Sequence, residues 1–186
     1  MDLHWNYFLS LDSDLKKLSR YIEFDLSNYQ TYSVELARIY LAASSECDVI
    51  FKLLCNKLNP SFEGENINHY RNLICQRLPE LSKEMVFIAR YHLAFQPFKE
   101  WSQAEYEGNP PWWKMHNKVK HNRDEYFKEA NLLNALNSVA GLFVLYFFYK
   151  KLNINTSNPK EVTRYLDPQP HLFKLEPEYY YSFLIT

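Results

Sequence analysis

Residues 33–58 read SVELARIYLAASSECDVIFKLLCNKL, and apolar side chains recur along this stretch at the three- and four-residue spacing of an α-helix. Ser33 can cap the first turn, and Glu35 follows in that turn, where a negative charge is favoured. Pro60 ends the pattern because proline cannot continue a helix. We therefore expect one helix of about 26 residues, a length usual in helical bundles. Its apolar face comprises Leu36, Ile39, Tyr40, Ala43, Cys47, Ile50, Leu54 and Leu58.

Helical spacing of apolar residues also occurs in other parts of the chain. Val139–Tyr149 is wholly apolar apart from Gly141, but its length of about 11 residues is short of the roughly 20 needed to cross a bilayer. We expect this run to lie in the central core helix, or in a helix at a dimer interface, and not in a membrane. The further predicted helices are Trp5–Ile22, Ile67–Leu78, Trp112–Lys120 and Lys128–Leu152.

One internal segment has a different period. Residues 85–95 read MVFIARYHLAF, and aromatic or apolar side chains alternate there with a mixed set, which is the period of two of a β-strand. Pro97 closes the segment. We predict a short extended segment near residues 85–95, although a helix would bury many of the same side chains.

The C-terminal part of the chain is rich in proline. Pro159, Pro168, Pro170 and Pro177 interrupt residues 153–186, which have no apolar pattern sufficient for a core of their own. The sequence therefore predicts a helical domain over residues 1–152. Residues 153–186 are expected to form an irregular strap packed on that domain or on a partner subunit.

Composition supports a folded, mainly α protein. Hydrophobic residues make up 47 % of the 186 residues, which argues against disorder, and only three glycines are available for the turns of a sheet protein. A formal net charge of −1 gives no global attraction to nucleic acid, so any such contact requires a local patch. Cys47, Cys55 and Cys75 are odd in number and lack the spacing of a metal or disulfide motif. With an acidic, polar N-terminus, they favour a cytoplasmic protein with no membrane partner.

The most informative local segment is residues 112–123, which read WWKMHNKVKHNR. On a helix, Trp112, Met115 and Val119 form one stripe by their spacing of three and four residues. Lys114, Asn117 and His121 form a second stripe on the opposite side. The apolar stripe is expected to anchor the helix, while the polar stripe presents an amine, an amide and an imidazole together.

These residue types suit phosphate chemistry. A histidine with a pKa near its usual value of about 6.5 can give or take a proton near neutral pH. Nearby ammonium and guanidinium groups can stabilise the negative charge that develops on phosphate during RNA cleavage. The alternative is that the charged face is only solvated and that the histidines are structural, because clustered charges mark functional sites only statistically.

The sequence HNKVKH followed by NR resembles the signature of HEPN domains. In that signature an arginine, commonly followed by asparagine or another polar residue, precedes a histidine by four to six intervening residues. Asn117 and His121 match the polar residue and the histidine. The positions open to the arginine hold Lys114, Met115 and His116, so this chain departs from the pattern there. Lys114 shares the face of His121 and is the candidate substitute, although lysine lacks the bidentate fork of arginine.

The resemblance implies an antiparallel helical bundle and a metal-independent ribonuclease of the toxin or defence type, which acts as a homodimer without a cofactor. Its implied partners are RNA or a nucleotide, a second copy of the chain, and an antitoxin-like protein. The alternative is a catalytically inert HEPN-like module that binds a nucleotide, RNA or a protein. The implied catalytic residues are His121, Asn117 and Lys114; the phosphate-binding residues are Lys118, Lys120, Arg123 and His116; and Glu46 is a candidate to orient His121.

Overall fold

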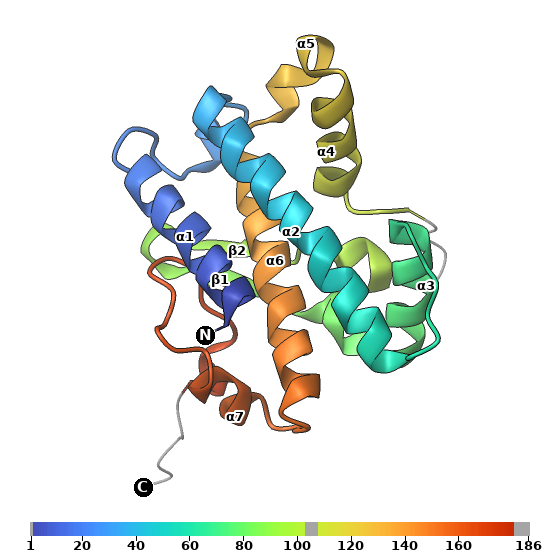
Figure 1. Ribbon diagram of the computed structural model, residues 1–186. Helices are drawn as coiled ribbons and strands as arrows, with labels where there is room; N and C mark the ends of the chain where they lie inside the picture. The colour runs from blue at the N-terminus through green and yellow to red at the C-terminus, as the bar shows by residue number, and fades with distance from the viewer. Residues whose placement is uncertain (1, 103–107, 181–186) are drawn as a thin grey trace, which may run out of the picture.

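The computed structural model describes residues 2–102 and 108–180, and within these ranges the protein is mainly helical, as predicted. A single two-stranded sheet accompanies the helices in the described part of the chain. The helices are α1 (Leu3–Leu18), α2 (Val34–Leu58), α3 (Ile67–Arg77), α4 (Pro111–His121), α5 (Arg123–Tyr126), α6 (Leu132–Asn153) and α7 (Pro159–Arg164); the strands are β1 (Val86–Ile88) and β2 (Leu93–Phe95) (Figure 1).

The long helix α2 begins and ends where its sequence indicates. The hydroxyl of Ser33 accepts a hydrogen bond of 3.1 Å from the backbone N–H of Leu36, which satisfies one of the open donors of the first turn. Asn59 caps the other end and is followed by Pro60. The expected apolar face is buried, apart from Leu58, which is partly buried.

Helix α6 is the central element of the core. Its side chains are buried on every side from Leu142 to Phe148. By length and composition α6 could cross a membrane, but 83 % of its most apolar window is buried inside the protein, as expected for a core helix. The helix begins at Leu132 and not at the expected Lys128, because residues 127–129 form a 3₁₀ turn and Asn131 caps α6.

The two long helices cross each other and start at the same end of the molecule (Figure 1). Tyr32 and Asn131, just before α2 and α6, are joined by a β-bridge, and the N–H of Leu132 donates to the carbonyl of Thr31. The two long helices therefore run in the same direction, and the antiparallel bundle implied by the resemblance is not confirmed. Helix α1 runs opposite to both long helices (Figure 1).

The alternating segment forms a hairpin and not one continuous strand. Strands β1 and β2 pair antiparallel, and the left-handed backbone of His92, with φ of 53°, completes the turn between them. The single extended segment expected near residues 85–95 is thus two short strands joined by a turn. The helix α1 also ends four residues before the expected Ile22, since the chain turns after Ser19.

The C-terminal segment lies against its own chain as far as Tyr180. The buried carboxylate of Asp12 on α1 accepts backbone hydrogen bonds from His171, Leu172 and Phe173, at 2.7, 3.0 and 3.3 Å. The segment contains the short helix α7, a 3₁₀ turn at Pro177–Tyr179 and a β-bridge between Lys174 and Phe87. Residues 181–186 of the expected strap lie outside the described ranges.

Candidate nucleic-acid interface on α4 and α5

Helix α4 is fixed to the core by its tryptophans. Pro111 occupies the first position of the helix, where its missing N–H costs nothing. The indole Nε1 of Trp112 donates to the carbonyl of Pro97 at 2.9 Å, and the hydroxyl of Tyr40 donates to the carbonyl of Trp112. Trp113 packs edge-on against Phe51 of α2, with ring centroids 5.5 Å apart. These contacts of the apolar side therefore fix the direction in which the opposite side of α4 points.

The opposite side of α4 faces solvent. Asn122 ends the helix with an extended φ, and α5 begins at Arg123, so the chain bends at Asn122. The exposed side chains of this surface, which we call the α4–α5 face, are Lys114, Asn117, Lys118, Lys120, His121 and Arg123. Asp124 and Glu125 are exposed beside them and reduce the net positive charge.

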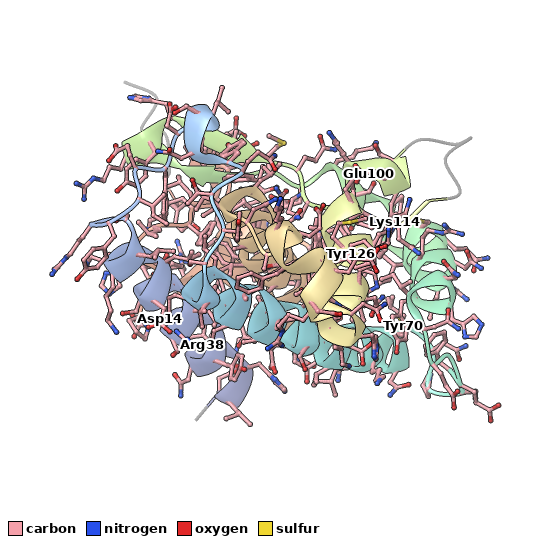
Figure 2. All side chains as sticks on the ribbon, turned by 90° about the horizontal axis from the view of Figure 1, so that it is seen from above. Asp14, Arg38, Tyr70, Glu100, Lys114 and Tyr126 are labelled. Carbon is pink, nitrogen blue, oxygen red and sulfur yellow. The ribbon has the colours of Figure 1, made fainter. Side chains whose placement is uncertain are left out.

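An aromatic contact holds one of the cations. The ammonium group of Lys118 lies over the ring of Tyr126, 4.9 Å from its centroid. Figure 2 looks down on α4 and α5, with Lys114 and Tyr126 labelled. Tyr126 belongs to α5, beyond the bend, so helical spacing within α4 could not have indicated this contact. A lysine already held over an aromatic ring loses less freedom when it binds an anion.

His116 differs from the other expected phosphate contacts. Its side chain is only 6 % exposed and packs against Trp113, with ring centroids 5.4 Å apart. Burial, followed by the positive charge of Lys120, lowers the pKa of His116 to about 4. A buried imidazole that is neutral at pH 7 offers no charge to a phosphate. The expected phosphate-binding role of His116 therefore does not fit its position.

Glu46 also differs from its expected position. Its carboxylate lies 2.6 Å from Nδ1 of His4 and so faces α1, and the described residues include no contact between Glu46 and His121. Helix α1 packs beside α2 and supplies His4 at this point, which the sequence of α2 alone could not reveal. Asp48 and Lys52, one turn apart on α2, form a surface ion pair at 2.6 Å.

The α4–α5 face combines an exposed imidazole with four exposed cations. Ammonium and guanidinium groups bind phosphate oxygens, and an imidazole at the surface can exchange protons with a bound ligand. Within the described residues, no group of three or more His, Cys, Asp or Glu side chains is placed to hold a metal ion. The face therefore has the composition of an anion-binding surface with one proton-transfer group.

The fold and this face define a mainly helical protein with a basic surface on one short helix. Comparisons of the chain with models of protein families, with curated proteins and with solved structures find no match. The resemblance to HEPN domains thus rests on the residues from Asn117 to Arg123 and stays a prediction.

Proposed function

We propose that the α4–α5 face binds the phosphate backbone of RNA and that His121 transfers protons in a metal-independent cleavage of the strand, as in a HEPN-like ribonuclease. The exposure of His121 beside Lys114 and Asn117, opposite the tryptophan anchor, is the observation that carries this proposal. Lys118, Lys120 and Arg123 extend the cationic surface on both sides of His121.

The proposed reaction uses the 2′-hydroxyl of RNA itself. The 2′-oxygen forms a bond to phosphorus while the bond to the 5′-oxygen breaks, which leaves a 2′,3′-cyclic phosphate and a 5′-hydroxyl. A base removes the proton of the 2′-hydroxyl, and an acid returns a proton to the departing oxygen. His121 fits either role, and Lys114 would stabilise the charge on the phosphate oxygens.

The test compares RNA cleavage by the wild type and by His121→Ala, with and without a chelator of divalent metals. We expect the chelator to have no effect and His121→Ala to lower the rate by about 100-fold or more, since general acid–base catalysis contributes at least that factor. Lys57→Ala removes an exposed cation in the last turn of α2 and is the matched control. Intact RNA after incubation with the wild type would refute the catalytic proposal.

The alternative is an inert HEPN-like module that binds RNA or a nucleotide. It is favoured by the lysine at the position of the motif arginine, because Lys114 cannot form two parallel hydrogen bonds to one phosphate. In this case His121→Ala would leave RNA binding unchanged, and no cleavage would occur in either protein.

We further propose that the homodimer implied by the resemblance forms at a groove beside the α4–α5 face. The groove has a volume of about 900 Å³, and its apolar wall includes Val34, Leu41 and Phe127. Val34 is 78 % exposed, and Arg123 belongs to both the groove and the cationic face. Val34→Glu is expected to convert a dimer into a monomer in sedimentation, whereas a wild-type monomer at high concentration would contradict the proposal.

A further inference from the structure

A small cavity lies at the first turn of α4. Its volume is about 170 Å³, close to the roughly 150 Å³ that holds a benzene-sized molecule in other proteins. The cavity opens between the segment after β2 and the first turns of α4 and α6. It is lined by Gln96, Pro97, Lys99, Glu100, Pro111, Trp112, Leu133, Asn134 and Asn137.

Glu100 is the one carboxylate among these lining residues. Glu100 is only 7 % exposed, and no hydrogen bond or ion pair joins it to another described residue. A carboxylate with little access to water is stabilised by a cationic partner. Lys99 is adjacent in sequence but its side chain is exposed and forms no ion pair with Glu100. The cavity thus contains a negative charge that the described part of the protein leaves unpaired.

The amide side chains of the cavity supply both acceptors and donors. Nε2 of Gln96 donates to the carbonyl of Ser82 at 2.9 Å. The Nδ2 atoms of Asn134 and Asn137 donate to the carbonyls of Glu129 and Leu133, at 2.8 and 3.0 Å. Each amide nitrogen therefore uses one of its two N–H groups in these bonds, and the amide oxygens remain as acceptors.

We propose that this cavity binds the ammonium or guanidinium group of a small organic molecule, with Glu100 as its counter-ion. One carboxylate with three amide oxygens matches a monovalent cation that carries several N–H donors. The indole of Trp112 and the ring of Pro97 supply an apolar wall, against which a guanidinium plane packs well. A divalent metal ion would find only one negative ligand here, so the organic cation is the better fit.

The rim of the cavity indicates a second feature of the ligand. Lys99 is exposed and lines the cavity together with the buried Glu100. A molecule with a cationic group at one end and a carboxylate at the other would place its cation at Glu100 and its carboxylate near Lys99. The ligand class is thus a small zwitterion with an ammonium or guanidinium end. This proposal is independent of RNA cleavage at His121.

The experiment titrates the protein with L-arginine and with agmatine, which lacks the carboxylate, and measures heat and tryptophan fluorescence. We expect both compounds to bind and L-arginine to bind more tightly. Glu100→Gln should weaken both by about tenfold or more, because a hydrogen-bonded ion pair is lost. Lys99→Ala should remove the preference for L-arginine. Glu63→Gln, an exposed carboxylate outside this cavity, is the control.

Far-ultraviolet circular dichroism checks that each variant is folded. Asn137→Leu, which is similar in size and removes one acceptor oxygen, is a second variant in case Glu100→Gln fails to fold; it should weaken binding of agmatine. Absence of binding at millimolar concentrations would overturn the proposal, as would equal affinity in Glu100→Gln and the wild type. Binding of Mg²⁺ or Ca²⁺ in preference to both organic probes would also overturn it.

Discussion

The buried carboxyl group of Glu84 gives a quantitative prediction for the dependence of stability on pH. Glu84 lies before β1, and one of its oxygens accepts a hydrogen bond of 3.2 Å from the hydroxyl of Tyr179 in the C-terminal segment. The other oxygen is buried and has no partner in the described residues. Burial raises the pKa of Glu84 to about 7; Glu176 and Glu80 act in the same direction, against the Tyr179 hydrogen bond and Lys151.

The sign follows from the protons bound in each state. Between pH 4.5 and about 7 the folded protein keeps the proton of Glu84, while the unfolded chain has released it. The free energy of unfolding therefore falls as pH rises through this window. The difference between about 7 and 4.5 corresponds to about 3 kcal/mol, at about 1.4 kcal/mol for each pH unit.

Glu84→Gln removes this dependence, since glutamine resembles the protonated carboxyl group and can still accept from Tyr179. We expect the variant to match the wild type near pH 4.5 and to exceed its free energy of unfolding by up to about 3 kcal/mol at pH 8. Urea unfolding followed by tryptophan fluorescence at both pH values measures the difference. Glu178→Gln, which removes an exposed carboxylate from the same segment, is the control.

The wild type must be compared with Glu84→Gln because His116 changes the free energy of unfolding with pH in the opposite direction. Its pKa is lowered from 6.5 to about 4, so the unfolded chain binds a proton there that the folded protein does not, and stability rises with pH between these values. The two effects overlap in the wild type. The reasoning about Glu84 is refuted if the difference between Glu84→Gln and the wild type is the same at pH 5 and pH 8.

Three other perturbations test the fold and the face. Gly141→Ala would place a Cβ 2.9 Å from the ring of Trp112, so we expect a loss of about 1–3 kcal/mol in the free energy of unfolding despite the better helix propensity of alanine; a gain would show that Trp112 shifts freely. Asp12→Ala leaves three backbone donors without their acceptor and should increase proteolysis of the C-terminal segment in a limited digest, whereas an unchanged digest would contradict this anchor. If Lys120 contacts phosphate, Lys120→Ala should reduce the salt dependence of RNA binding by a slope of about 0.7, and an unchanged slope would place Lys120 outside the interface.

Local features of the fold were predictable because they depend on neighbours in sequence. The cap at Ser33, the burial of Trp112 and Val119, and the exposure of His121 all follow from spacing along one helix.

Features that depend on distant segments were not predictable in this way. The shared starting end of α2 and α6 is set by the bridge between Tyr32 and Asn131, which are about a hundred residues apart. Glu46 contacts His4 because α1 packs beside α2. The position of Glu100 in a cavity depends on the first turns of α4 and α6, which lie far from it in sequence or on other elements. The spacing of residues within one segment does not indicate such contacts between distant segments.

Because α2 and α6 start at the same end of the molecule, their helix dipoles affect the electrostatic potential at the α4–α5 face. Each peptide unit carries a dipole, and the N-terminus of a helix bears the equivalent of about half a positive charge. Val34 at the beginning of α2 and Arg123 of α5 line the same groove, so the beginning of α2 lies next to α5. Helix α6 begins a few residues after α5. The positive ends of both helix dipoles therefore lie at the same end of the molecule. Part of the attraction of this end for anions should remain when any single lysine is removed.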